Sequence, residues 1–344
     1  MNSIVKLDDV RRATKPARLG FLGVGWIGRS RMEAMLATGL VTAEAVADPC
    51  AQTLEAALAA APAAEGVLTL DELLDRDLDG IVIATPSAQH ADQALRALNA
   101  GVAVFCQKPL GRNADEVRAV VDVARTANVL LGVDLSYRHT KGMQRIKELL
   151  DARELGGVMA VDLTFHNAYG PDKPWFYDRE QSGGGCLIDL GVHLIDLALW
   201  ALDFPRIVSV SSHLMAQGKP LSDLSGPVED FAVATLQLEG GTVVRIACSW
   251  RLNAGTDCVI DATFYGTTGG AAMRNINGSF YDFTTDKFLG TSKETLVMPP
   301  DDWGAQAAIA WAKQLCLGTR FDPASENLIT VSETIDQIYR SSKV

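Results

Sequence analysis

Residues 18–28 read Arg-Leu-Gly-Phe-Leu-Gly-Val-Gly-Trp-Ile-Gly, and this stretch decides the fold. Its apolar first half predicts a buried strand, and Gly23, Gly25 and Gly28 give the spacing Gly-x-Gly-x-x-Gly where a helix begins. There the first glycine allows a tight turn, the second lets backbone amides approach a pyrophosphate, and the third lets helix and strand pack closely. We expect Trp26 and Ile27 to line the same loop. Alone, the pattern also fits an ordinary glycine turn.

Asp48 is the second signal for a dinucleotide. It lies 20 residues past Gly28, at the end of the next apolar run, where a carboxylate can accept both hydroxyls of an adenosine ribose. The carboxylate would repel a 2′-phosphate, and residues 49–51 (Pro-Cys-Ala) offer no cation to bind one. The sequence therefore favours NAD, with NADP as the weaker alternative. Asp48 also begins an Asp-Pro turn, which is a purely structural reading.

The chain around this motif alternates short apolar strands with helical stretches up to about residue 138. That alternation predicts an α/β fold with an N-terminal Rossmann domain, a doubly wound parallel sheet. The predicted strands are 18–23, 42–47, 80–84, 102–106 and 129–134. The predicted helices are Arg29–Ala37, Gln52–Ala61, Asp71–Leu74, Ala88–Asn99 and Ala114–Ala127.

The second half predicts a C-terminal α+β domain with an open, mostly antiparallel sheet. Its strand-like stretches include Met159–Phe165, Ile207–Leu214, Ala232–Leu238, Thr242–Trp250 and Val259–Tyr265. Helices are expected at about 141–150, 184–201 and Asn327–Tyr339. The predicted organisation is a tail at 1–17, the dinucleotide domain at 18–138, the second domain at 139–325 and a C-terminal helix at 326–344.

Composition narrows the class of protein. Of the 344 residues 48% are hydrophobic, and the net charge of −11 argues against a nucleic-acid partner, which would need a basic face. We expect no membrane partner either, because no window approaches the roughly 20 apolar residues of a spanning helix and no signal peptide is evident. The six scattered cysteines, with no Cys-x-x-Cys pair, are typical of a reducing compartment, so we expect a cytoplasmic protein.

Two segments follow predicted strands of the first half, at the sheet edge where open α/β sheets bind ligands. One contains Thr85, Pro86, Ser87 and His90, and we expect these residues to contact the cofactor, with His90 in a supporting role. The other is Gln107-Lys108-Pro109, which places Lys108 near the nicotinamide end.

The predicted helix at 184–201 carries Asp189, His193 and Asp196 on one face among apolar residues. Ionisable groups on a buried helix need partners, so the cluster is a candidate acid/base site. Asp196 suits a structural hydrogen bond better, whereas Asp189 and His193 suit function. A metal site, with His166 as a further ligand, is the less favoured alternative.

Taken in order, these motifs resemble the Gfo/Idh/MocA family, the glucose–fructose oxidoreductase and inositol 2-dehydrogenase group. The resemblance includes Tyr137-Arg138 and the glycine run at 183–185 that leads into Asp189 and His193. It implies that Lys108, Asp189 and His193 surround the reacting carbon. It also implies that the second domain binds substrate and is used in oligomerisation, giving a homodimer or homotetramer through its sheet.

One residue departs from the family pattern. Many relatives have Glu before the lysine, where this chain has Gln107. The loss of that negative charge should make the Lys108 amine easier to deprotonate and should alter contacts to the nicotinamide ribose.

These features predict an NAD-dependent dehydrogenase acting on a secondary alcohol of a cyclic polyol or sugar. We expect Lys108, Asp189 and His193 to contact the substrate, and the further candidate substrate residues are Arg138, His166, Tyr169 and Trp175. Two alternatives stay open, a ketosugar reductase in a biosynthetic pathway and a non-catalytic NAD-binding sensor. A sensor would have no need for Lys108, Asp189 and His193 together.

Overall fold

The structure is a computed structural model that describes residues 10–11, 14–221, 223 and 225–342. The chain forms two compact units. The first unit comprises Met1–Gly111, Asp115–Asp134 and Ala305–Ile329, and the second comprises Arg112–Ala114, Leu135–Gly304 and Thr330–Val344. Each unit has its own hydrophobic core.

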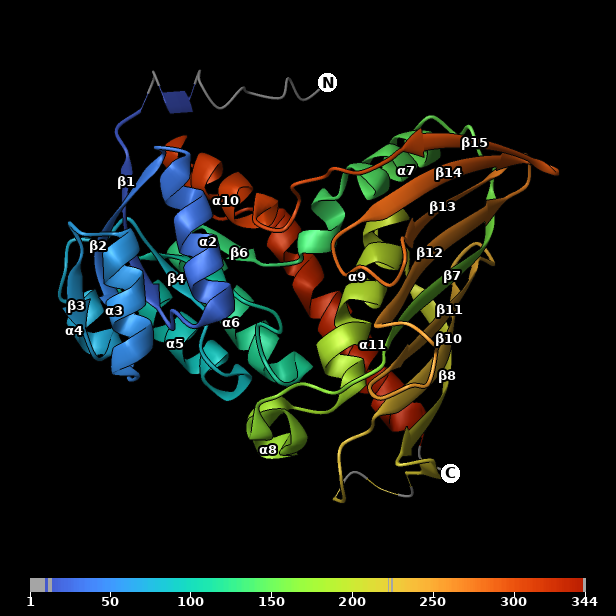
Figure 1. Ribbon diagram of the computed structural model, residues 1–344, viewed down its shortest axis with the longest axis horizontal. Helices are drawn as coiled ribbons and strands as arrows, with labels where there is room; N and C mark the ends of the chain where they lie inside the picture. The colour runs from blue at the N-terminus through green and yellow to red at the C-terminus, as the bar shows by residue number, and fades with distance from the viewer. Residues whose placement is uncertain (1–9, 12–13, 222, 224, 343–344) are drawn as a thin grey trace. The chain divides into compact units, whose positions relative to one another are not determined.

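The first unit contains a six-stranded parallel sheet in the order β3-β2-β1-β4-β5-β6, which confirms the predicted doubly wound fold (Figure 1). Its strands are β1 (Ala17–Leu22), β2 (Val41–Ala47), β3 (Glu65–Val67), β4 (Gly80–Ile83), β5 (Ala103–Cys106) and β6 (Leu131–Val133). Its helices are α2 (Trp26–Ala37), α3 (Ala51–Ala60), α4 (Leu70–Leu74), α5 (Ser87–Asn99) and α6 (Ala114–Ala127). The sequence did not predict β3, which has only three residues, two of them exposed.

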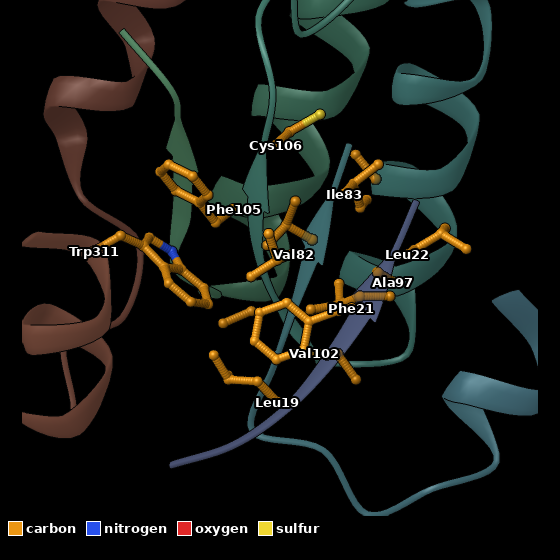
Figure 2. Close-up of a cluster of buried hydrophobic side chains, with 14 of the residues drawn as sticks. Leu19, Phe21, Leu22, Val82, Ile83, Ala97, Val102, Phe105, Cys106 and Trp311 are labelled. Atoms are coloured by element: carbon orange, nitrogen blue, oxygen red, sulfur yellow. The ribbon is translucent and has the colours of Figure 1, made fainter. Parts of the chain in front are cut away.

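Helix α10 (Gln306–Cys316) completes the core of this unit. Its Trp311 is 2% exposed and lies against Phe105 of β5, with 5.8 Å between the ring centroids (Figure 2). We expected residues 305–325 in the second domain, and that boundary was wrong. Ala307, Ala308 and Trp311 form a buried helical stripe that covers strands β5 and β6, so this segment belongs with the parallel sheet.

The tail predicted at 1–17 lies mostly outside the described residues. Within the described part, Val10 is buried in the core of the first unit and Ala17 already belongs to β1. The described end of this segment is therefore docked onto the unit.

The second unit contains a nine-stranded sheet in the order β15-β14-β13-β12-β7-β11-β10-β8-β9. All its neighbouring pairs are antiparallel except β7 with β11, which agrees with the predicted mostly antiparallel sheet. Its strands are β7 (Val158–Asn167), β8 (Ile207–Ala216), β9 (Lys219–Pro220), β10 (Phe231–Leu238), β11 (Val243–Ser249), β12 (Cys258–Gly266), β13 (Gly270–Asn275), β14 (Phe283–Leu289) and β15 (Ser292–Val297).

Helices cover one face of this sheet (Figure 1). They are α7 (Lys141–Asp151), α9 (Val192–Ala201) and α11 (Asn327–Ser341), the last confirming the predicted C-terminal helix. The short helices of the unit are η1 (Ser136–His139), η2 (Pro174–Tyr177), α8 (Arg179–Ser182) and η3 (Leu187–Gly191), while η4 (Pro323–Glu326) lies in the first unit.

One helix among the described residues, the continuous stretch Arg179–Ala201, is long and apolar enough to cross a membrane. We expected no such stretch. However, 83% of its apolar window is buried within the protein, as in the core helix of a globular domain, so its apolar character has a structural cause.

We predict that Gly132→Ala destabilises the first unit. An added Cβ would lie 2.6 Å from Trp311 Cδ1 and 3.2 Å from Phe105 Cδ2, so two buried rings would have to move. The expected loss is about 1–3 kcal/mol of unfolding free energy, measured by thermal and urea denaturation. Gly157→Ala is the control, because nothing lies within 4 Å of its added Cβ. Equal stability of the two variants would contradict the tight packing of Trp311.

Candidate active site

The glycine loop has the geometry that a pyrophosphate requires. Gly23 has φ +80, and an added Cβ would lie 2.7 Å from the Ala84 carbonyl at the end of β4. An added Cβ on Gly28 would lie 2.1 Å from Gly23 O, so the helix could not approach the strand. A Cβ added to Gly25 would have no neighbouring atom within 4 Å, which leaves open space beside the first amides of α2. Those amides have no acceptor inside the helix and suit an anion.

Asp48 follows β2 and is 8% exposed. Its Oδ2 accepts the Val24 N–H at 2.9 Å, and its Oδ1 accepts the Cys50 N–H at 2.8 Å. The side chain therefore forms the Asp-Pro turn that the sequence indicates as a structural role. It also connects the end of β2 to the glycine loop. Each carboxylate oxygen retains a second lone pair for a ribose hydroxyl. The loop, the helix start and Asp48 together fit a dinucleotide.

His90 connects the two predicted cofactor segments. Its Nδ1 lies 2.7 Å from Pro109 O and its Nε2 lies 2.7 Å from Thr85 O. Burial lowers the pKa of His90; the two carbonyls oppose that shift, and the charge of Lys108 adds a smaller effect in the same direction as burial. Both ring nitrogens are thus committed to backbone, so His90 holds the Lys108-Pro109 turn against the end of β4 and serves the site indirectly.

The structure also gives the positions of the other residues predicted to contact the cofactor. Pro86 precedes the first residue of α5, Ser87, which is buried, and Thr85 Oγ1 donates to Gln93 Oε1 at 2.6 Å. Trp26 is 70% exposed at the start of α2, followed by the partly buried Ile27. Gln107 is buried, and its amide donates to the carboxylate of Asp134.

In the second unit, the buried carboxylate of Glu229 anchors the start of the helix that carries Asp189 and His193. Glu229 has 0% exposure, and its Oε1 accepts the N–H groups of Gly185 at 2.8 Å and Leu187 at 3.1 Å. The Tyr339 hydroxyl donates to the same oxygen at 2.7 Å. Burial, then the charge of Glu229, raises the pKa of Tyr339, so this hydroxyl keeps its proton.

These contacts explain the glycine run. A Cβ on Gly184 would lie 1.9 Å from the Tyr339 hydroxyl oxygen, and a Cβ on Gly185 would lie 1.9 Å from Glu229 O. Only glycine allows the chain to pass so close to both groups.

The helix that follows is not a regular α-helix throughout. Residues Leu187–Gly191 form a π-helical turn, η3, and α9 starts at Val192. The prediction of one uniform helix over 184–201 was therefore wrong in its geometry. A wide turn of this kind is typical of functional positions, and here it contains Asp189.

Aromatic residues of the second unit contact Asp189 and His193. The Trp250 indole N–H donates to Asp189 Oδ2 at 3.1 Å. The Tyr137 ring meets the His193 ring edge-on, with 4.9 Å between centroids, and His193 is 9% exposed. The sequence did not single out Trp250, whose only signal is its place at the end of a predicted strand.

Asp196, which is buried, and Arg138, which is partly exposed, form a separate ion pair. Arg138 Nε donates to Asp196 Oδ2 at 2.6 Å, and its Nη2 donates to Oδ1. Burial raises the pKa of Asp196, and Arg138 opposes that rise. The structural reading of Asp196 agrees with this pairing. Arg138, which we expected to touch substrate, instead has its guanidinium committed to Asp196.

The remaining substrate candidates are spread over the second unit. His166 points to the sheet face opposite Phe165, where its Nδ1 lies 2.7 Å from Ser249 Oγ and its ring stacks on Phe231, so the structure does not group it with Asp189 and His193. Tyr169 is 51% exposed. Trp175 stacks on Phe176, whose ring meets Trp250 edge-on.

A metal ion was the alternative for this helix. Across the described part of the chain, no three His, Cys, Asp or Glu side chains gather in an arrangement that could hold one.

Two family profiles match the chain in succession. Residues 17–135 match the oxidoreductase family with an NAD-binding Rossmann fold, and residues 143–272 match the Gfo/Idh/MocA C-terminal domain. The chain belongs to the Gfo/Idh/MocA family. Its first unit is accordingly a Rossmann domain of the NAD-binding type, as the resemblance implied.

Three curated relatives are similar to this Gfo/Idh/MocA protein. It is 33% identical over 236 residues to dTDP-3,4-didehydro-2,6-dideoxy-alpha-D-glucose 3-reductase of Saccharopolyspora spinosa, covering 67% of this chain and 68% of that one. It is 29% identical over 259 residues to inositol 2-dehydrogenase of Rhizobium meliloti (strain 1021), covering 75% and 76%. It is 27% identical over 205 residues to D-glucoside 3-dehydrogenase of Escherichia coli (strain K12), spanning 57% of this chain but only 58% of that enzyme.

Solved structures share the fold over nearly the full length. GenD2 from gentamicin A biosynthesis, solved with NAD, matches with TM-score 0.80 and 25% identity, covering 95% of this chain and 94% of that one. The 3-ketoreductase KijD10 from Actinomadura kijaniata, solved with NADP, matches with TM-score 0.79 and 22% identity, covering 95% and 98%.

We predict that Arg138→Met destabilises the second unit in a pH-dependent way. The substitution leaves the carboxylate of Asp196, 2% exposed, without its cation, which should cost about 3–5 kcal/mol near neutral pH. Without Arg138 the folded-state pKa of Asp196 rises further above its unfolded value. The loss is therefore small at acidic pH, where the carboxyl is protonated, and grows as pH rises through that folded-state pKa.

Thermal denaturation between about pH 5 and pH 8 measures this loss. The double variant Arg138→Met/Asp196→Asn should recover most of the stability at the higher pH. A loss of equal size at every pH would show that the ion pair is not its cause.

Proposed function

We propose that this protein is an NAD-dependent oxidoreductase that transfers hydride between the nicotinamide and a secondary alcohol or ketone of a cyclic polyol or sugar. The observation that carries the proposal is the helix with Asp189 and His193, each oriented by an aromatic partner, in a chain whose other unit has a dinucleotide loop. The relatives named above act, by their names, on inositol, a glucoside and a nucleotide-linked sugar. They support the substrate class.

The residues divide the work of alcohol oxidation. His193 takes the hydroxyl proton as general base, and Lys108 stabilises the developing alkoxide by its charge. Asp189, whose Oδ2 is held by Trp250, uses its other oxygen to orient ring hydroxyls or the imidazole. Bound NAD supplies the nicotinamide C4 that accepts the hydride. Gly23, Gly25, Gly28 and the start of α2 hold its pyrophosphate.

NAD rather than NADP is the proposed cofactor. The reason is the carboxylate of Asp48 at the end of β2, fixed by two backbone N–H groups with a lone pair left on each oxygen. The 2′-phosphate that NADP carries in place of a ribose hydroxyl would meet the like charge of the Asp48 carboxylate.

The second candidate function is reduction of a ketosugar, the reverse of the same reaction. It is favoured by the relative at 33% identity, a sugar 3-reductase by name. The same residues serve both directions, with His193 donating the proton. A non-catalytic NAD sensor is less favoured, because it would not need Lys108, Asp189 and His193.

Two further proposals follow from the sequence and the family. We place the protein in the cytoplasm, on the basis of its scattered cysteines. We propose a homodimer or homotetramer formed through the sheet of the second unit, as the resemblance implies, with a small-molecule substrate and neither nucleic acid nor membrane as partner.

The central test is an NAD-reduction screen over inositols, aldopyranoses and their acids at mildly alkaline pH. We predict that His193→Ala and Lys108→Ala each lower kcat by about 10²–10⁴-fold on the substrate it finds. NADH affinity, measured by fluorescence titration, should change little in His193→Ala. Retained turnover in both variants would refute the assigned site.

We predict that Asp48→Ala raises the KM for NAD by about tenfold or more and leaves the KM for NADP nearly unchanged or lower. The reason is the loss of hydrogen bonds from ribose hydroxyls to a charged group, worth about 1.5–3 kcal/mol each. Thermal denaturation controls for the two backbone contacts of Asp48. A wild-type preference for NADP in steady-state kinetics would contradict the cofactor assignment.

A further inference from the structure

A buried group of three side chains lies beside Lys108 in the first unit. Gln107 is the first residue after β5 and Asp134 is the first after β6, so both lie at the carboxyl ends of adjacent parallel strands. The Asp134 N–H donates to Cys106 O at 2.9 Å, which fixes the two strand ends side by side. Their side chains therefore meet at the edge of the sheet where the glycine loop also lies.

One oxygen of Asp134 joins the three residues. The Gln107 Nε2 amide donates to Asp134 Oδ2, and Arg31 Nε donates to the same atom at 2.7 Å. Asp134 is 1% exposed, Arg31 is 8% and Gln107 is 9%. A carboxylate this deeply buried is stable only with a cation and hydrogen-bond donors around it. Arg31 supplies the cation and Gln107 supplies a donor.

The three residues come from the elements that carry the proposed chemistry. Arg31 belongs to α2, the helix that begins at the glycine loop. Gln107 directly precedes Lys108, and its own N–H donates to Ile83 O at 2.8 Å, which fixes the backbone there. Asp134 thus links the helix of the glycine loop to the segment that carries Lys108.

This contact also explains why residue 107 carries an amide. A carboxylate at this position would face the carboxylate of Asp134 with one guanidinium between them, and two like charges in contact cannot both stay ionised at low cost. An amide of the same shape donates instead of repelling. The chain therefore holds one negative charge in this group, on Asp134.

We propose that Arg31, Asp134 and Gln107 are positioning residues, and that the single negative charge of Asp134 holds the Lys108 segment and the helix of the glycine loop in one arrangement. The proposal rests on the proposed function in assigning Lys108 its role. The positioning role itself stands on the contacts of the three side chains.

The substitution Gln107→Glu gives the proposal a distinctive signature. When the introduced carboxyl group is protonated it keeps the shape of the amide and donates to Asp134. When it ionises it repels Asp134. The like charge should raise its folded-state pKa above the unfolded value of about 4.3, so the variant matches the stability of wild type only below that unfolded value and loses stability as pH rises from there to the raised pKa.

Other titratable and charged groups lie around this site in wild type and variant alike. Burial, then the charge of Asp134, raises the pKa of Cys106, which remains a thiol. Burial lowers the pKa of His90, which favours its neutral form. Arg31 and Lys108 are the neighbouring cations. Because wild type carries all of these groups, a pH effect found in the variant and absent from wild type reports on the introduced carboxyl group.

The experiment compares wild type, Gln107→Glu, Asp134→Asn and the double variant Gln107→Glu/Asp134→Asn. Tm and the Kd for NADH, the latter by fluorescence titration, are measured at about pH 5.5 and about pH 8.5. We expect the Kd of Gln107→Glu to match wild type at the lower pH and to be weakened by about tenfold at the higher pH, and we expect its deficit in Tm to be larger at the higher pH than at the lower. The double variant, with one carboxylate and one amide exchanged, should return to within about threefold of wild type at both pH values.

Three results would overturn the proposal. They are a Gln107→Glu variant equal to wild type at both pH values, a double variant no better than Gln107→Glu, and a Tm that follows the expected pattern while the Kd for NADH does not. Asp134→Asn alone leaves Arg31 without its carboxylate and need not fold, so the decision rests on the other proteins. Failure of wild type to bind NADH would contradict the proposed function instead, and the Tm comparison would still decide the charge exchange.

Discussion

The buried carboxylate of Glu229 is the constraint on which the second unit depends. A charge without contact to water must be met by donors, and here backbone N–H groups of the site helix and the Tyr339 hydroxyl meet it. The close approach of these segments also explains two glycines, because a Cβ at Gly184 would collide with the Tyr339 hydroxyl and a Cβ at Gly185 would collide with the main-chain carbonyl of Glu229. The helix start is thereby fixed in position, and with it the π-helical turn that carries Asp189. The acid/base groups owe their placement to a residue that takes no part in the proposed chemistry.

The first unit uses a buried carboxylate in a comparable way. Asp134 gathers Arg31 from the helix of the glycine loop and Gln107 from the end of β5, while His90 ties the next turn of chain to the end of β4. In both units a charged or polar side chain placed deep in the protein binds several segments at one point. Such groups stabilise little on balance, but they select one arrangement of the segments around them, because every alternative leaves a buried polar atom unpaired.

Local pattern was enough to predict the Rossmann sheet, the glycine loop, Asp48 and the helix with Asp189 and His193, because each depends on residues close together in the chain. Trp250, Glu229 and Asp134 escaped prediction because they act on residues 27 to 110 positions away, through contacts that only the fold creates. The partners of Arg138 and His166 could not be predicted for the same reason, since Asp196 and Ser249 are distant from them in sequence. Edge strands such as β15 escaped because most of their side chains are exposed and give no apolar alternation.

The return of the chain to the first unit through α10 has a consequence for the order of folding. Trp311 fills a site between β4, β5 and β6, where Gly80 and Gly132 leave room for its ring. The strands of the parallel sheet all lie before residue 135, yet its core lacks this residue until Leu135–Gly304 of the second unit has been synthesised. The first unit therefore cannot reach its final packing before most of the second unit has left the ribosome. Its contacts also have a high sequence separation, which slows folding.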